Sequence, residues 1–319
     1  MGWTANDIPD HTGKVALITG ANSGLGLHSA LALAARGAQV LMACRDPHRA
    51  AVAVEQVAAA ASGPPPLVVQ LDLADLSSVR EAAETIGAQA PRIDLLMLNA
   101  GVMAMPRSRT ADDFEIHFGT NHLGHFALAG RLISHVLASP EPRVVVTSSL
   151  GHRVGRMRWN DPNWSGRLYS SSLAYGQSKL ANLLFMTELA RRADACGSPL
   201  LVVGAHPGSA HTNLASHNDN PVVRGVYDLM RRYSTQPGEM GALPQLYAAT
   251  MPDVVQADYW GPDGPFEFHG GPARASASRA ARDQVAAERL WTLSECLTGV
   301  TWPSPLSSSG PGASRPVSA

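Results

Sequence analysis

Cysteine is scarce in this chain of 319 residues, which contains only Cys44, Cys196 and Cys296, at widely separated positions. Three cysteines this far apart exclude a disulfide framework and do not match the ligand spacing of a metal site. Long apolar runs are missing as well, because no stretch reaches the roughly 20 residues that a membrane-spanning helix needs. Residues 1–14 lack the basic start and apolar core of a secretory signal. We therefore expect a cytoplasmic protein in a reducing compartment.

An excess of charge of either sign is also absent, because 25 Lys and Arg residues face 26 Asp and Glu residues, for a formal net charge of -1. We therefore expect no polyanionic partner such as nucleic acid. Histidine is more frequent, and His117, His122 and His125 lie close together in the sequence. No His-Glu-x-x-His pattern or carboxylate partner completes a metal site around them, so no metal is expected.

Short apolar segments alternate with helical segments through the first two thirds of the chain. This alternation is typical of βαβ crossovers, which build a parallel sheet covered on both faces. The sequence therefore predicts an α/β fold, a single doubly wound domain of the Rossmann type over residues 14–300 with about seven strands. Strands are expected at 15–19, 39–44, 67–71, 93–98, 143–148 and 200–205, and helices at 25–36, 48–61, 77–89, 112–137 and 173–192.

The alternation stops after His206. Segment 207–236 carries an apolar stripe at helical spacing, flanked by arginines, and we expect a substrate lid rather than a membrane-surface helix. A homo-oligomer interface formed by the same stripe is the alternative. A last short strand is expected at 259–260 and a helix at 280–297. Residues 1–13 form an N-terminal extension, and the Ser-, Pro- and Gly-rich residues 301–319 are expected to be a disordered tail. The stripe consists of Val222, Val223, Val226, Leu229, Met230 and Tyr233.

A glycine-rich turn, TGANSGLG at 19–26, joins the first predicted strand to the first predicted helix. Glycines allow the backbone to turn tightly and to approach a pyrophosphate, while the helix offers unpaired N–H groups and its positive end. The position between strand and helix favours a nucleotide site over a turn without a ligand. Cofactor contacts are expected from Gly20, Asn22, Ser23, Gly24, Leu25 and Gly26.

Further motifs follow at consistent spacing, and with them residues 14–260 resemble the classical short-chain dehydrogenase/reductase family. The stretches FEIHFGTNHLGHF (114–126), AYGQSKLANLLF (174–185) and HPGSAHT (206–212) are most similar to its retinol-dehydrogenase-like branch. Leu98 departs from the pattern, since the family more often has an asparagine there. The motifs are Asp72, Asn99-Ala100-Gly101, Asn121, Ser149, Tyr175-x-x-x-Lys179 and Pro207-Gly208.

The resemblance implies an oxidoreductase whose catalytic residues are Asn121, Ser149, Tyr175 and Lys179. Tyr175 would be the general acid/base, and Lys179, on the same helix face, would lower a phenol pKa that is ordinarily about 10 and bind the nicotinamide ribose. Ser149 would steady the charge on the substrate oxygen, with Ser148 as the competing candidate. Asn121 would hold a water that links Lys179 to solvent.

The resemblance also assigns the remaining cofactor contacts. Asp72 and Leu73 would meet the adenine, and Asn99, Ala100 and Gly101 would let the cofactor lie against the backbone. Pro207, Gly208 and Thr212 would line the nicotinamide end.

The end of the second strand decides between NAD(H) and NADP(H). An acidic residue there selects NAD, but this chain has neutral Cys44 followed by Arg45, which favours NADP(H), with NAD(H) as the second choice. Asp46 next to it is predicted to cap the following helix, with Pro47 at the first helical position.

The substrate is expected to be a lipophilic alcohol, ketone or aldehyde. A non-catalytic NADP(H) sensor or scaffold and a reductase of carbon–carbon double bonds are the alternatives, and the complete catalytic set favours the alcohol/carbonyl enzyme over the sensor. Apolar pockets with one polar reacting group suit such substrates. Apolar walls are expected from Val102, Met103, Met105, Met157, Trp159 and Trp164.

Overall fold

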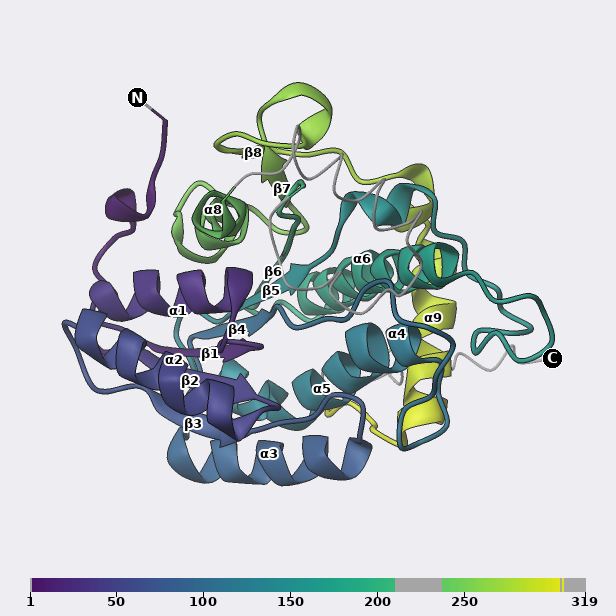
Figure 1. Ribbon diagram of the computed structural model, residues 1–319, viewed down its shortest axis with the longest axis horizontal. Helices are drawn as coiled ribbons and strands as arrows, with labels where there is room; N and C mark the ends of the chain where they lie inside the picture. The colour runs from purple at the N-terminus through teal and green to yellow at the C-terminus, as the bar shows by residue number, and fades with distance from the viewer. Residues whose placement is uncertain (1, 210–236, 305, 307–319) are drawn as a thin grey trace, which may run out of the picture.

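The computed structural model describes residues 2–209, 237–304 and 306 and contains one eight-stranded sheet with helices on both faces (Figure 1). The strand order is β3-β2-β1-β4-β5-β6-β7-β8. Neighbouring strands from β3 to β7 are parallel, and β8 is antiparallel to β7. The strands are β1 (Val15–Thr19), β2 (Gln39–Cys44), β3 (Leu67–Gln70), β4 (Leu95–Leu98), β5 (Arg143–Thr147), β6 (Leu201–Ala205), β7 (Tyr259–Pro262) and β8 (Pro272–Arg274).

The doubly wound α/β prediction is confirmed, with one strand more than the seven expected, namely the antiparallel edge strand β8. The chain winds outward from β1 to β3 and then returns to place β4 on the other side of β1. A crevice forms at such a reversal, at the carboxyl ends of the strands, and this is where ligands bind in doubly wound sheets.

Two hydrophobic cores lie on the two faces of the sheet. Successive strand residues alternate between them, so Leu17 and Leu41 enter one core while Ile18 and Met42 enter the other. One face is covered by α1 (Gly24–Ala35), α2 (Pro47–Ala60) and α8 (Gly238–Thr250), and the other by α3 (Leu76–Gln89), α5 (Gly124–Leu137) and α6 (Ser171–Ala195), with α9 (Gln284–Thr298) packed on α6.

The helix predicted at 112–137 begins later than expected and is not regular. It starts as α4 (Ile116–Phe118), passes through a π-helical turn η2 (Gly119–Leu123) and continues as α5. Two glycines permit this path, because a Cβ on Gly119 would lie 2.4 Å from Thr110 Cγ2 and one on Gly124 would lie 2.3 Å from the Leu73 carbonyl oxygen. Such π turns often occur at functional sites, and Asn121 lies within this one.

The C-terminal part differs from the prediction in two respects. Helix α8 was not expected, because its sequence contains Pro244 and two glycines, yet its apolar residues pack against α1, β6 and β7. The predicted start of the disordered tail, residue 301, is too early, since Trp302 and Leu306 are buried in the core with Trp291. The stripe at 222–233, and with it most of the expected lid at 207–236, lies outside the described residues.

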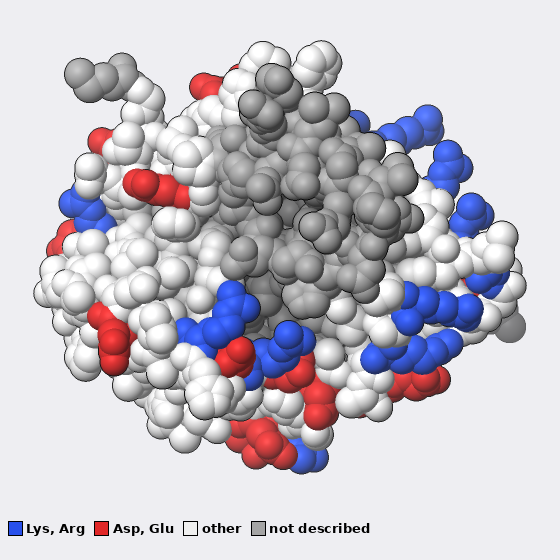
Figure 2. Space-filling model, viewed as in Figure 1, with Lys and Arg blue, Asp and Glu red and all other residues white. Residues whose placement is uncertain are grey.

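The surface agrees with the balanced composition. Basic and acidic side chains are interspersed along the lower part of the face that Figure 2 shows. Within the described ranges, no helix is both long enough and apolar enough to cross a membrane. The N-terminal extension packs on the domain, because Ile8 is buried and the Trp3 ring contacts Tyr247 of α8 at 5.1 Å between centroids.

Candidate active site

A cleft of about 250 Å³ opens at the carboxyl ends of the central strands. Its walls contain most of the residues predicted to bind a cofactor, brought together from the loops after β1, β2, β3 and β4. Gly26, Tyr175, Lys179, Pro207 and Gly208 do not line it, and Thr212 lies outside the described residues. The predicted residues in its walls are Gly20, Asn22, Ser23, Gly24, Leu25, Arg45, Asp72, Leu73, Asn99, Ala100 and Gly101.

The glycine-rich turn is shaped by two close approaches that exclude a side chain. Gly20 has a φ of 70°, in the left-handed region that favours glycine. A Cβ on Gly26 would lie 2.3 Å from the Gly20 carbonyl oxygen and 2.7 Å from Asn99 Nδ2. Gly26 therefore supports the cleft from behind, which explains why it is absent from the walls.

Thr19 and Asn99 tie this turn to the loop after β4. Thr19 Oγ1 accepts the N–H groups of Asn99 and Ala100, both at 2.9 Å, and Asn99 Nδ2 donates to the Thr19 carbonyl at 2.8 Å. The two loops that would hold the pyrophosphate and the adjoining ribose thus form one hydrogen-bonded unit.

The far end of the cleft, beyond β2, carries two cations and a neutral thiol. Cys44 is buried, and burial raises the pKa of its thiol to about 11. Asp46 Oδ1 accepts the N–H groups of His48 and Arg49 at 2.9 and 3.1 Å, so the predicted helix cap is confirmed. Arg45 and Arg49 both line the cleft. Arg49 was not predicted, although its position in the first turn after the cap could have indicated it.

Tyr175 and Lys179 lie on one face of α6, as their spacing predicts. Lys179 Nζ is 5.8 Å from the centroid of the Tyr175 ring and donates to the Thr147 carbonyl at 3.3 Å. Lys179 is buried rather than a surface lysine, and burial lowers its pKa to about 8. Within the described residues no carboxylate forms an ion pair with it. Its charge is therefore available to a neighbouring phenolate.

The two candidate serines after β5 have different surroundings. Ser148 is buried, and its hydroxyl donates to the Lys179 carbonyl at 2.9 Å. Ser149 is partly exposed, and a Cβ placed on Gly151 would lie 3.6 Å from Ser149 Oγ and 3.1 Å from Tyr175 Cε1. Ser149 Oγ, which accepts the Gly151 N–H at 3.1 Å, and the Tyr175 ring thus both lie beside Gly151, and the greater exposure of Ser149 favours it over Ser148 as the group that faces a substrate.

Asn121 is fully buried rather than solvent-facing. Its Oδ1 accepts the Val102 N–H at 2.7 Å, and its Nδ2 donates to the Val102 carbonyl at 3.0 Å and to Ser178 Oγ at 2.9 Å. A Cβ placed on Gly101 would lie 3.1 Å from Asn121 Oδ1 and 3.3 Å from Lys179 Nζ. Gly101, which lines the cleft, is thus the point where the catalytic candidates meet the cofactor candidates.

Gln245 of α8 is a supporting residue that the sequence did not reveal. Its Nε2 donates to Ser29 Oγ at 2.7 Å and to Asn99 Oδ1 at 3.1 Å, and its Oε1 accepts the Thr147 hydroxyl at 3.1 Å. One buried amide therefore joins α1 to the ends of β4 and β5. Without a prediction of α8, no signal marked it.

The three neighbouring histidines have separate partners. His117 Nδ1 lies 2.7 Å from Glu115 Oε1, His122 Nε2 lies 2.8 Å from Ser294 Oγ, and His125 Nε2 lies 2.9 Å from Thr19 Oγ1. His117 does have a carboxylate partner in Glu115, but this pair alone does not make up a metal site. Among the described residues, no group of three or more metal-binding side chains converges.

Comparison with known proteins agrees with this geometry. Residues 14–221 match the family model of the short chain dehydrogenases. Mouse retinol dehydrogenase 11 is 39% identical over 290 residues, which cover 90% of this chain and 87% of that protein. Human retinol dehydrogenase 13 is 36% identical over 299 residues, which cover 92% of this chain and 86% of that protein.

A solved structure is similar over nearly the whole chain. The crystal structure of an uncharacterized protein from Mycobacterium paratuberculosis has 42% sequence identity and a TM-score of 0.80, and the match covers 95% of this chain and 100% of that one. The chain therefore belongs to the short chain dehydrogenase family, in its retinol-dehydrogenase-like branch, and is an NAD(P)-dependent oxidoreductase that acts on CH–OH groups.

Proposed function

We propose that this protein interconverts a lipophilic alcohol and its aldehyde or ketone, with NADP(H) as the hydride carrier and Tyr175 as the general acid/base. The convergence of side chains supports the proposal: Ser149 and Tyr175 meet at Gly151, while Lys179 and Asn121 meet at Gly101 in the cleft wall. A protein that only binds a nucleotide has no need of these four residues.

The cleft fits a dinucleotide. In the glycine-rich turn Gly20 lies in the cleft wall in a left-handed conformation and Gly26 packs behind it, and the N-terminus of α1 follows directly. Ser23, at the N-cap of α1, makes no side-chain hydrogen bond to the first turn. The first N–H groups of α1 are therefore not capped by the Ser23 hydroxyl. When bound, the nicotinamide supplies or accepts the hydride. The loops after β1 and β4 would hold it against the sheet.

The preference for NADP(H) rests on charge at the end of β2. Arg45 and Arg49 line the cleft there, and guanidinium groups pair well with a phosphate. The strand ends in the buried, neutral thiol of Cys44 instead of a carboxylate that would repel the 2′-phosphate. The nearby Asp46 also lines the cleft, but its Oδ1 accepts the N–H groups that begin α2.

Proton transfer falls to Tyr175. Its phenolate oxygen accepts the proton of the alcohol during oxidation, and its hydroxyl donates the proton to the carbonyl oxygen during reduction. The buried ammonium of Lys179, 5.8 Å from the ring centroid, stabilises the phenolate that this exchange requires. The Ser149 hydroxyl donates to the substrate oxygen and stabilises the charge that develops on it.

Asn121 provides a route for the proton to solvent. Its side chain already has partners at Val102 and Ser178, so a water that links Lys179 to solvent would bind the main-chain carbonyl of Asn121. That carbonyl lies in the π-helical turn and accepts Nδ1–H of His125 at 2.9 Å.

The lipophilic substrate is supported by the apolar end of the cleft. Val102, Met103 and Met105 line it beyond Gly101. Met157, Trp159 and Trp164, which were expected to wall the same space, do not line this cleft. Met157 and Trp159 pack against the main core, and Trp164 is buried.

A turnover screen with purified protein tests the proposal. It covers long-chain aldehydes, retinoids, steroids and aromatic ketones, each with NADPH and with NADH, next to small sugars, hydroxy acids and a conjugated enone. We expect carbonyl reduction of the apolar compounds, faster with NADPH. Turnover of small hydrophilic compounds alone would refute the lipophilic substrate. Reduction of the enone double bond alone would indicate a carbon–carbon reductase, and tight cofactor binding without any turnover would indicate a sensor.

A further inference from the structure

A second buried polar cluster lies next to the site and takes no part in the proton transfer described above. Glu115 and His117 are 2% and 0% exposed, and Tyr169 is partly buried beside them. Glu115 Oε1 lies 2.7 Å from His117 Nδ1 and accepts the Tyr169 hydroxyl at 2.9 Å. The cluster thereby joins the start of α4 to the segment that precedes α6.

The hydrogen bonds assign the protonation of each member. The second oxygen of Glu115 accepts the Phe118 N–H at 2.7 Å, so three donors surround this carboxyl. Burial alone would raise the pKa of Glu115, but the hydrogen bonds from the His117 side chain and from the Phe118 N–H hold it below its usual value, so the carboxylate is ionised. His117 Nδ1 therefore carries a proton, and Nε2 is left to accept the Met105 N–H at 3.3 Å.

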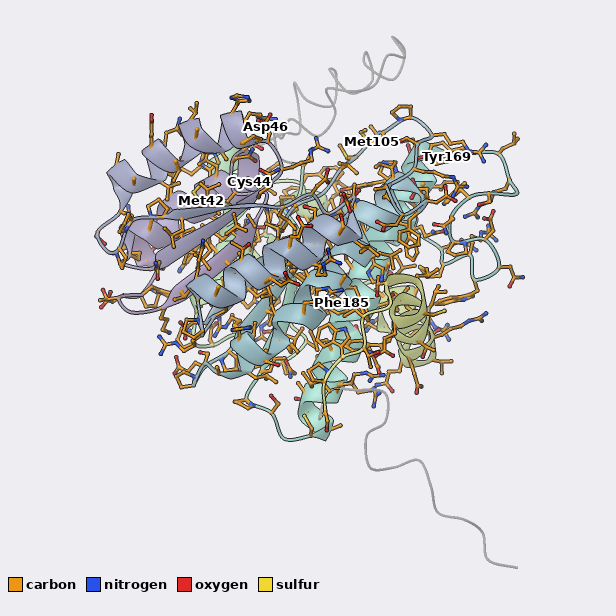
Figure 3. The ribbon with its side chains drawn as sticks, turned by 90° about the horizontal axis from the view of Figure 1, so that it is seen from below. Met42, Cys44, Asp46, Met105, Tyr169 and Phe185 are labelled. Atoms are coloured by element: carbon orange, nitrogen blue, oxygen red, sulfur yellow. The ribbon has the colours of Figure 1, made fainter. Side chains whose placement is uncertain are left out.

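Met105 brings the cluster into contact with the substrate side of the cleft. It lies in the loop after β4 and lines the cleft, and Figure 3 shows Met105 and Tyr169 next to each other, apart from Cys44 and Asp46 at the cofactor end. The preceding residue, Ala104, has a φ of 56°, a strained conformation for a residue with a side chain. Such strain persists only where the surroundings hold the backbone in place.

His117 also contacts the proposed acid/base. Its ring centroid is 6.1 Å from that of Tyr175, at an interplanar angle of 74°, which is an edge-to-face contact. The same imidazole thus contacts the Tyr175 ring with its ring edge and holds the Met105 backbone with Nε2.

Charged groups also lie near the cluster. They are Arg107, which donates to the Trp164 carbonyl at 3.2 Å, and Arg167, whose guanidinium lies 3.5 Å from the centroid of the Trp164 ring.

We propose that Glu115, His117 and Tyr169 form a positioning clamp that fixes the strained loop at Met105 and the ring of Tyr175 relative to each other. The clamp sets the width of the substrate side of the cleft at Met105, and among the described residues it makes no hydrogen bond to the glycine-rich turn or to Arg45 and Arg49 at the cofactor end. His117 is its central positioning residue. The effect on turnover rests on the proposed function, whereas the effect on the loop does not.

Two substitutions of His117 separate its two hydrogen bonds. In His117→Asn the amide can still donate to Glu115 but is too short to accept the Met105 N–H, whereas in His117→Gln the longer amide can reach Met105. We expect His117→Asn to speed amide hydrogen exchange of residues 102–109 and to raise the KM for the carbonyl substrate, each by about tenfold. We expect His117→Gln to restore both to within about threefold, and the Kd for NADPH to stay within about twofold in each variant.

The outcomes distinguish the clamp from a purely structural role. Unchanged exchange in His117→Asn, equal defects in both variants, or a parallel loss of NADPH affinity would overturn the proposal. Should either His117 variant fail to fold, Tyr169→Phe, which removes one hydroxyl, decides by the same exchange measurement: faster exchange supports the clamp, and unchanged exchange refutes it. Exchange requires no substrate, so absence of turnover in the wild type would refute the proposed function while the clamp is still tested.

Discussion

Two guanidinium groups, those of Arg45 and Arg49, face the cleft at the end of β2 and give the site its only proposed means of telling NADPH from NADH. Their neighbour Cys44 is uncharged, and Asp46 is engaged by the start of α2. NADPH differs from NADH only by its 2′-phosphate. The preference between the two cofactors therefore depends on whether the two arginines contact that phosphate.

Replacing either arginine should reduce the use of NADPH selectively. We expect Arg45→Ala and Arg49→Ala each to lower kcat/KM for NADPH by roughly 10- to 100-fold, since a charge-assisted hydrogen bond contributes about 1.5–3 kcal/mol. The value for NADH should change little. Arg80→Ala on α3, which removes a half-exposed arginine paired with Glu81, is the matched control. A wild type that prefers NADH, or an unaltered cofactor ratio in both variants, would contradict this assignment.

Residues of the site were predictable from the sequence where a local pattern marks them. The glycine turn, Tyr175 with Lys179, and the cap at Asp46 each depend on neighbours within a few positions of the chain. Gln245 escaped prediction because its partners come from distant segments. Glu115 and His117 are local to each other, but the contacts that join them into a cluster with Tyr169 and Met105 come from other segments. Gln245, for example, bonds Ser29 and Asn99, and no local spacing encodes such a contact.

The elements of the molecule follow their sequence patterns most closely where one face is apolar and the ends are marked. Strand β2 has the predicted bounds, because a buried apolar run lies between Gly37 and the cap at Asp46. The π turn at 119–123 was not predictable, since it depends on the approach of Thr110 and Leu73 to two glycines. Tertiary contacts likewise override the unfavourable local propensity of α8.

The segment after α9 belongs to the core, although its composition suggested disorder. The Trp302 ring lies 4.6 Å from that of Trp291 and 5.6 Å from that of Phe126, between centroids, and Trp302 is 1% exposed. A Cβ on Gly130 would lie 2.8 Å from Trp302 Nε1, so the glycine of α5 makes room for this ring.

Removing this ring should destabilise the whole domain. We expect Trp302→Ala to lower the free energy of unfolding by about 3–5 kcal/mol, the usual cost of a large cavity in a core. Leu168→Ala is the control, since Leu168 is 96% exposed and its removal should cost less than about 0.5 kcal/mol. Urea unfolding followed by far-ultraviolet circular dichroism measures the stability of both variants. Equal stabilities of the two variants would show that the segment after α9 adds nothing to the core.

At the scale of the whole molecule, burial of Lys179 links stability to pH. The pKa of Lys179 falls from 10.5 to about 8 because the ammonium is removed from water. Between these pH values the unfolded chain holds a proton that the native protein has released. The contribution of Lys179 to the free energy of unfolding therefore rises with pH from about 8 to 10.5, while below 8 the native protein bears the full cost of a buried charge.

A difference measurement isolates this contribution. Lys179→Met keeps most of the side-chain volume without the charge, and the titration of other groups cancels in the comparison with the wild type. We expect the stability of the wild type relative to the variant to increase between pH 8 and 10.5, by on the order of 1–3 kcal/mol. A difference that is constant or decreasing over this range would mean that Lys179 is solvated or paired in the native protein.

The arrangement of sheet, helix and loops is centred on the Tyr175 hydroxyl in the proposed mechanism. The sheet reversal places the cofactor cradle at β1 and β4, α6 presents Tyr175 beside it, and η3 (Leu150–Arg153) brings Ser149 to the same point. Phenylalanine at position 175 would keep the ring packing against Gly151 and His117 while it removes the hydroxyl that we propose transfers the proton.

The most direct measurement compares the wild type with Tyr175→Phe on the best carbonyl substrate of the screen, with NADPH binding followed separately. We expect kcat to fall by about 10²–10⁴-fold, the typical contribution of a positioned acid/base, while the Kd for NADPH stays within about twofold. Near wild-type turnover by Tyr175→Phe would contradict the proposed role of Tyr175, because the proton would then come from another group.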